Sequence, residues 1–169
     1  MERVTLPDGA EVLIRSLRPG DRAAYAEAME SMSARSRYLR FAAPKPRFSD
    51  KELDFLTQVD GDRHVALVAL AGESQRGLGV ARYVRVDDGT ADVAIGITDA
   101  WQRRGLGRLL LSRLIDRARA AGLAALTATA LAENEGSLRM LHGAGFMLTT
   151  RGGITNDYRL DLARDRVPA

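Results

Sequence analysis

The residues best suited to chemistry in this chain gather in one basic turn that contains two glycines. Gly105 and Gly107 stand among three arginines, Arg103, Arg104 and Arg108. Glycine lets a backbone approach a bulky ligand closely, and the N-terminus of a helix offers unpaired N–H groups and a partial positive charge. The arginines add positive charge at the rim. Such a turn is predicted to hold a pyrophosphate.

The elements on either side support this prediction. The segment 92–98 carries β-branched residues at alternate positions, which is typical of a strand. From Leu106 to Ala118 the apolar residues recur at helical spacing, and Gly122 ends that pattern. The turn therefore joins a strand to the N-terminus of a helix, where phosphate groups bind.

Two nucleotide motifs do not fit. A Walker A loop needs Lys and Ser or Thr after its last glycine, but Arg108 and Leu109 follow Gly107. A Rossmann fingerprint needs Gly or Ala at the position of Leu110. The pattern Gln102-x-x-Gly-x-Gly instead resembles the acetyl-CoA loop of the GNAT superfamily of N-acetyltransferases, which implies acetyl-CoA as co-substrate.

A second block strengthens the resemblance. The segment 126–131 reads as a strand, and Asn134, a short apolar helix and the pair Gly145-Phe146 follow it in the order of that superfamily. Further motifs, at 6–9, 19–21 and 37–41, are similar to a bacterial subgroup that contains protein-lysine acetyltransferase (Pat-like) domains. The resemblance to the superfamily covers residues 92–146.

The order of elements alone predicts a mixed α/β or α+β fold. We expect a hairpin at 4–15, a helix from an N-cap at Asp21 through Met32, a helix from Ser49, and strands at 65–70, 78–84, 92–98, 126–131, 146–150 and 157–162. The resemblance adds the GNAT arrangement: a mixed, mostly antiparallel sheet, flanked by helices, whose fourth and fifth strands splay in a V. One domain is expected over 1–163, with a flexible tail over 164–169.

The resemblance also implies which residues hold the cofactor. Its pantetheine arm pairs with the backbone of the fourth strand, and its pyrophosphate lies on the basic turn. The implied cofactor-binding residues are Ile95, Gly96, Ile97, Gln102, Arg103, Arg104, Gly105, Leu106, Gly107, Arg108 and Asn134. For Gly96 a β-bulge without a ligand is the alternative. Asn134 also suits a helix N-cap, and both roles can hold together.

Acetyl transfer needs a group that accepts a proton, because an ammonium such as that of lysine has a pKa near 10.4 and attacks only as the free amine. The subgroup places a glutamate for this near the start of the fourth strand, where this chain has Asp92. Its shorter side chain favours contact through a water, and burial would have to raise its pKa. The alternative is a carboxylate at the strand edge without a catalytic role.

A second departure concerns the acid that protonates the leaving thiolate. Many relatives carry a tyrosine where this chain has Leu141, so water or the neighbouring His142 would have to serve. A surface position in the helix is the alternative for His142. The other histidine, His64, opens an apolar strand and reads as structural. Two histidines so far apart predict no metal site.

Composition narrows the function classes. The 169 residues include no cysteine, which excludes a thiol-bound acetyl-enzyme and favours direct attack in a ternary complex. Basic and acidic residues are mixed along the chain and the formal net charge is +3, so no nucleic-acid face is expected. No apolar run is long enough for a membrane span, and a cytoplasmic bacterial protein is expected.

The acceptor implied by the subgroup is a protein lysine. A small amine (a polyamine, an amino acid or an antibiotic) is the alternative within enzymes. A sensor that binds acyl-CoA without turnover is the alternative outside them, since Asp92 and Leu141 both depart from the family pattern. Whether the chain forms a homodimer is left open.

Overall fold

The computed structural model describes residues 1–72 and 74–162, and their strands form one eight-stranded sheet in the order β1-β2-β3-β4-β5-β6-β8-β7. The predicted tail at 164–169 lies outside the described residues. The strands are β1 (Glu2–Thr5), β2 (Glu11–Ser16), β3 (His64–Ala71), β4 (Gly77–Arg85), β5 (Thr90–Ile97), β6 (Ala125–Leu131), β7 (Met147–Gly152) and β8 (Thr155–Asp161).

Neighbouring strands are antiparallel except for β5 and β6, which are parallel. The helices are α1 (Arg22–Glu30), α2 (Ala34–Phe41), α3 (Asp50–Thr57), α4 (Leu106–Ala120) and α5 (Glu135–Gly143). The predicted mixed fold, with a mostly antiparallel sheet and flanking helices, is confirmed. None of the described helices is long and apolar enough to cross a membrane.

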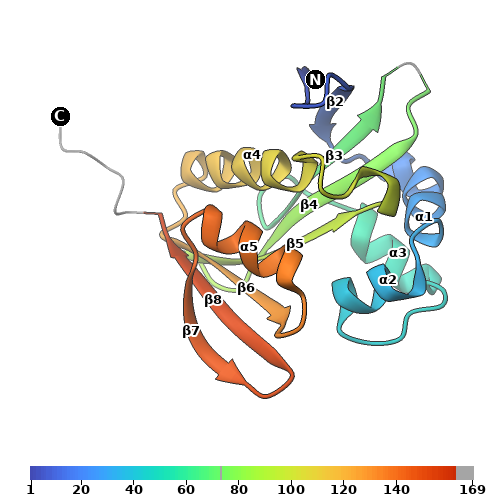
Figure 1. Cartoon of the computed structure of the whole chain (residues 1–169). Coiled ribbons are helices and arrows are strands. Elements are labelled where there is room, and N and C mark those ends of the chain that lie inside the picture. Colours follow the sequence, from blue (N-terminus) through green and yellow to red (C-terminus); the bar gives the residue numbers. More distant parts are fainter. Residues whose placement is uncertain (73, 163–169) are drawn as a thin grey trace.

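The sheet is covered on both faces. Alternate side chains of a strand point to opposite faces, so the continuously apolar β3 serves two cores. Val65, Leu67 and Ala69 pack with α4, whereas Ala66 and Val68 pack with α1 and α3. Figure 1 shows α4 and α5 on one side of the sheet and α1 to α3 on the other.

The N-terminal helical region differs from its prediction. The helix α1 ends at Glu30, and a separate helix, α2, follows at 34–41 after the N-cap Ser33. The Asp21 side chain does not cap α1. Instead it accepts two hydrogen bonds from the Arg15 guanidinium, at 2.7 and 2.8 Å, because this strand residue lies beside it.

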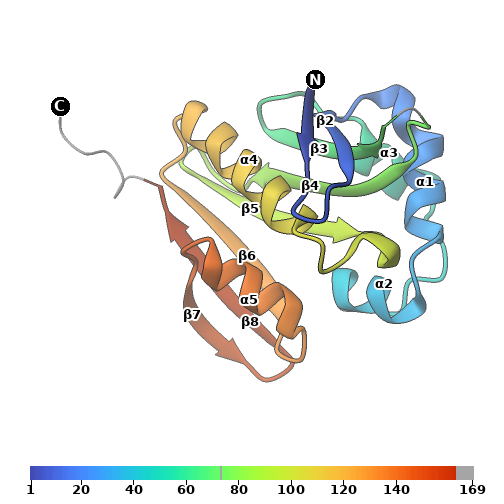
Figure 2. The same cartoon turned by 45° about the horizontal axis from the view of Figure 1, so that its top comes forward.

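The strands β5 and β6 are side by side only at their beginnings. Their pairing runs from Thr90 with Ala125 to Asp92 with Thr127 and then stops. Beyond this point the two strands separate toward α2 and α5 (Figure 2). They form the predicted V, as the fifth and sixth strands in chain order rather than the fourth and fifth.

Candidate functional site

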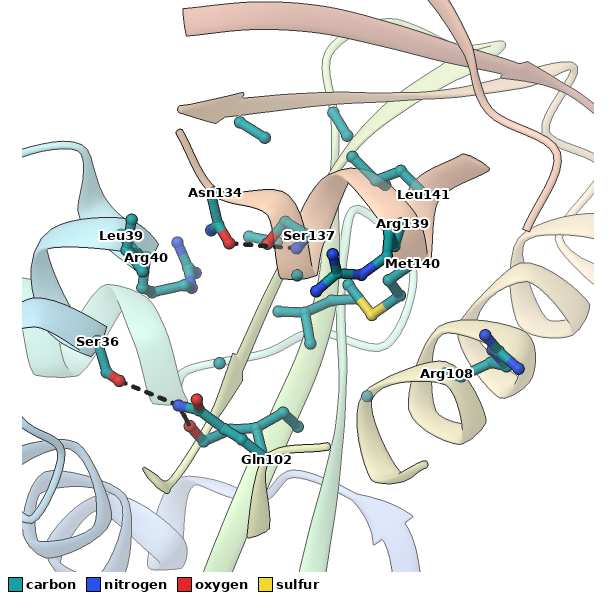
Figure 3. A pocket seen from close by; sticks show the side chains of 18 of the residues that line it. Ser36, Leu39, Arg40, Gln102, Arg108, Asn134, Ser137, Arg139, Met140 and Leu141 are labelled. Atoms are coloured by element: carbon teal, nitrogen blue, oxygen red, sulfur yellow. Dashed lines mark hydrogen bonds between the residues drawn. The ribbon is translucent and has the colours of Figure 1, made fainter. Parts of the chain in front are cut away.

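The opening between β5 and β6 contains a cavity of about 540 Å³. Residues of β5, β6, α2, the turn before α4, and α5 line it (Figure 3). It is therefore built where the parallel pair ends, because a strand that leaves its neighbour exposes an unpaired backbone edge.

The free edge of β5 can be assigned from the register with β4. Thr98 N–H donates to Leu78 C=O at 2.9 Å, and in an antiparallel pair such hydrogen-bonded positions alternate. Gly96 therefore pairs with Val80, and its backbone faces β4. Ile95 and Ile97 direct their N–H and C=O groups to the cavity.

The strand β5 also pairs regularly with β4 from Ala91 to Ile97, without a bulge at Gly96. A Cβ at Gly96 would lie 3.7 Å from the Arg40 side chain, so this glycine lies beneath α2. The bulge considered for Gly96 is thus absent, and the glycine instead marks a close contact between sheet and helix.

The N-terminus of α4 opens toward the same cavity. Gly105 caps the helix with φ +89°, a conformation that favours glycine, and Arg103 before it has φ +58°. The first intrahelical bond runs from Leu109 N–H to Gly105 C=O, so the preceding amides are available to a ligand. A Cβ at Gly107 would lie 3.1 Å from the Met140 sulfur, which shows how narrow the space is.

The opposite wall belongs to α5. Asn134 caps this helix by accepting a hydrogen bond from Ser137 N–H at 3.1 Å, and its side chain lines the cavity. Leu141 is buried and also lines the cavity, at the position where the family resemblance implies a tyrosine in many relatives. His142 is exposed, packs edge-on against the Tyr158 ring and does not line the cavity.

Hydrogen bonds fix α2 over the cavity mouth. Asp99, just after β5, accepts bonds from Ser33 N–H, Ser33 Oγ and Ser36 Oγ at 2.7–2.8 Å. Gln102 Nε2 donates to Ser36 Oγ at 3.0 Å and to Ile97 C=O at 3.1 Å. The helix that covers the cleft is therefore tied to the strand and turn beneath it.

Asp92 lies at the vertex of the V, beside the cavity rather than in its lining. Thr127 Oγ1 donates to Asp92 Oδ1 at 2.9 Å across the last paired position of the strands. Burial raises the pKa of the Asp92 carboxyl, while the Thr127 hydroxyl and the Arg40 charge act in the opposite direction. The pKa of the Asp92 carboxyl is thus closer than that of a free aspartate to the value that a general base needs.

Most of the predicted cofactor residues line this one cavity. They are Ile95, Gly96, Ile97, Gln102, Arg103, Gly105, Gly107, Arg108 and Asn134. Two do not. The Leu106 side chain is fully buried in the core, and Arg104 stacks on Trp101 and pairs with Asp8 at 2.5 Å.

The structure also brings into the cavity lining residues that lie outside the predicted catalytic and cofactor-binding set. Ser36 and Arg40 reach the cavity from α2, and Arg139 and Met140 reach it from α5. Ser33, three residues before Ser36, carried a local N-cap signal for α2, but its contact with Asp99 joins residues 66 positions apart. Within residues 1–72 and 74–162 no cluster of His, Cys, Asp or Glu could hold a metal ion.

Comparisons with known proteins agree with this geometry. A family model described as an acetyltransferase (GNAT) domain matches residues 11–147. An acetyltransferase of Pseudomonas aeruginosa is 32% identical over 146 residues, which cover 85% of this chain and 78% of that protein.

Among solved structures, the GNAT domain of S. lividans PAT has a TM-score of 0.89 at 28% identity, covering 95% of this chain and 96% of that one. A Salmonella typhimurium structure described as an acetyltransferase with its cofactor acetyl-CoA has a TM-score of 0.69 at 25% identity, covering 94% and 98%. The similarity therefore extends over nearly the whole chain.

Proposed function

This chain belongs to the GNAT acetyltransferase family, and we propose that it transfers the acetyl group of acetyl-CoA to a primary amine by direct attack in a ternary complex. The observation that carries the proposal is the position of Asp92. Its carboxyl stands at the vertex of the cleft, where the free edge of β5 begins.

The residues present fit acetyl-CoA. The free N–H and C=O groups of Ile95 and the N–H of Ile97 suit the amides of the pantetheine arm, and the amides at the start of α4 suit the pyrophosphate. The missing side chain at Gly107 leaves room that a Cβ would occupy. Arg103 and Arg108 line the cavity beside these amides and add positive charge.

In this site acetyl-CoA supplies an activated acetyl carbonyl and a thiolate leaving group. Asp92 accepts the proton of the acceptor ammonium, through a water because its side chain is short. The Thr127 hydroxyl holds one carboxylate oxygen, Oδ1, and leaves Oδ2 for that proton. Since Leu141 offers no proton to the thiolate, water in the open cleft supplies it.

The side chains available favour direct attack. A covalent acetyl-enzyme on a thiol is excluded because the chain has no cysteine. The acceptor amine must therefore reach the cleft while acetyl-CoA is bound. The helix α2, tied down by Asp99, forms the wall along which it would enter.

The resemblance favours a protein lysine as the acceptor, and we keep it as the first candidate. A small amine is the second candidate. The charge of Arg40 favours an acceptor that carries a negative group. Arg40 lines the cleft, and no carboxylate of the described residues is bound to it. A cationic acceptor such as a polyamine would be repelled there unless it carried a negative group as well.

Initial rates of CoA release with both substrates varied would test the proposal. Direct transfer predicts reciprocal plots that intersect, and no enzyme-bound acetyl group when the enzyme is incubated with acetyl-CoA alone. Parallel plots together with an acetylated enzyme would contradict direct attack. Acetyl-CoA binding without release to any amine would favour the sensor alternative.

A further inference from the structure

Two arginines, one lining the cleft on the α2 side and one buried beneath it, have no acidic partner among the described residues. Arg40 lines the cavity from α2, and its side chain extends into it (Figure 3). Arg82 lies under α1 and α3 and is only 2% exposed. No carboxylate of the described residues approaches either guanidinium within 4.0 Å, the limit for an ion pair. A buried cation such as Arg82 normally has such a partner, because burial of an unpaired charge is costly, whereas Arg40 is only partly buried and faces the cavity.

The two arginines belong to one cluster. Arg82 is opposite Ala94 on β5, and Arg40 lies over Gly96, two residues farther along the same face of that strand. Tyr25 stacks its ring under Arg82 at 5.4 Å and acts on the pKa of both guanidinium groups. The cluster therefore lies along the strand that carries Asp92, on the same face as that carboxyl.

Several polar atoms of this cluster have no hydrogen-bond partner among the described residues. Arg82 Nη1 donates to Leu56 C=O at 2.7 Å and lies 3.0 Å from His64 Nε2. Arg82 Nε, Arg82 Nη2 and the Tyr25 hydroxyl are buried without a hydrogen-bond partner among the described residues. The Arg40 guanidinium stacks on the Phe41 ring at 4.7 Å and makes no hydrogen bond or ion pair within the described residues. Burial and the charge of Arg82 together lower the pKa of Arg40 to about 10, so its guanidinium remains charged at neutral pH.

Asp92 does not neutralise this pair. It attracts Arg40 electrostatically, but the two side chains form no ion pair, and Asp92 Oδ1 is bonded to Thr127. Arg40 and Arg82 therefore place two positive charges on this side of the cleft, and Asp92 is the carboxylate that acts on Arg40. An incoming ammonium is repelled by this field, whereas an anion is attracted.

We propose that Arg40, with Arg82 behind it, forms a subsite for a carboxylate carried by the acceptor close to its amine. The planar guanidinium of Arg40 would bind the carboxylate through two parallel hydrogen bonds. Arg82 is a positioning residue, since it adds charge beneath the cleft floor without lining the cavity. The proposal rests on the proposed acetyltransferase function, because the subsite orients the amine toward Asp92.

Such a carboxylate can come from two sources. In a free amino acid it is the α-carboxylate beside the α-amine. In a protein acceptor it is an Asp or Glu side chain next to the target lysine. Both sources present the same carboxylate to Arg40. Polyamines carry no carboxylate, so the positive charges of Arg40 and Arg82 disfavour them as acceptors.

The test compares acceptors with and without this anion, and kcat/KM is referred to the concentration of free amine because removal of the carboxylate also lowers the pKa of a neighbouring amine. One arm uses leucine against leucinamide, and the other uses a lysine peptide with flanking Asp and Glu against the same peptide with Asn and Gln. In at least one arm the wild type is expected to show the higher kcat/KM for the carboxylated acceptor. Equal or lower values for the carboxylated acceptor in both arms would overturn the subsite while leaving the transferase intact.

Arg40→Gln is expected to reduce that preference by about 10- to 100-fold, the range of one charged hydrogen bond. Arg40→Lys should restore part of it, and Arg47→Gln, at an exposed position outside the cleft, should leave it unchanged. Because the readout is a ratio of two acceptors for one enzyme, a general loss of folding would not imitate it. An unchanged ratio in Arg40→Gln would overturn the proposal, and no CoA release from any amine would overturn the proposed function as well.

Discussion

Asp92 and Thr127 form the last cross-strand pair before β5 and β6 separate, and the Thr127 hydroxyl donates to Asp92 Oδ1 at 2.9 Å. The backbone register that opens the cleft therefore also orients the carboxyl at its vertex. The Asp92 carboxyl therefore lies at the position of the sheet where the free edge of β5 begins.

Thr127→Val is expected to shift the pH–rate profile. The Thr127 hydroxyl stabilises the ionised form of Asp92 and so lowers its pKa, which burial raises. Without this hydrogen bond the pKa rises further, and the active, ionised base forms only at higher pH. The acid limb of log kcat against pH should therefore move to higher pH, whereas Thr149→Val, on the outer hairpin, should leave it in place. A shift in the opposite direction would contradict this role of the hydroxyl.

Asp92→Asn keeps the shape of the side chain but removes the base. Turnover should fall by about 10²- to 10⁴-fold, the usual contribution of a general base, while acetyl-CoA affinity changes little. Asp92→Glu should retain most of the activity, because the resemblance places a glutamate there. Rates of CoA release and calorimetric Kd values would check both variants, and an unaltered rate in Asp92→Asn would remove this residue from the mechanism.

Gly107→Ala tests the cofactor cradle. The new Cβ would lie 3.1 Å from the Met140 sulfur and would fill space at the narrow part of the cleft. Since a methionine side chain can move, we expect a small effect on unfolding but a loss of acetyl-CoA affinity of about tenfold or more. Gly20→Ala is the matched control, because a Cβ there meets open space. Equal acetyl-CoA affinity in the two variants would place the ligand elsewhere.

His64 should make stability depend on pH. Burial and the Arg82 charge lower its pKa to about 4, from about 6.5 in the unfolded chain. Below pH 6.5 the unfolded state therefore binds more protons, and the free energy of unfolding falls as pH decreases toward 4. Between pH 7 and pH 5 the loss from this residue should be about 2 kcal/mol. Urea unfolding of wild type and His64→Gln would measure it, and an equal loss in both would show that His64 is not responsible.

The elements with strong local signals were predictable. Gly105 and Gly107 mark the start of α4. The continuous apolar run of β3 predicted a strand, and the turn at Gly9 predicted the N-terminal hairpin. Leu106 illustrates the limit within a motif, because neighbouring residues of one loop can face opposite ways. Its side chain enters the core while Gly107 lines the cleft.

The subgroup motif at 37–41 pointed to the acceptor region, but local patterns could not show which of its side chains reach the cleft. Arg40 and Arg82 lie 42 positions apart in the sequence, and only the packing of α2 on the sheet brings them to one strand. That packing depends on Asp99 binding Ser33 and Ser36 across more than 60 residues. Long-range polar contacts of this kind leave no periodic signal in one sequence.

Acetyltransferase function is tested most directly by a calorimetric titration with acetyl-CoA, followed by a thiol-release assay on the same protein with carboxylated and neutral amines. We expect a saturable complex with acetyl-CoA and release of CoA only when an amine is added. Failure to bind acetyl-CoA would contradict the central claim.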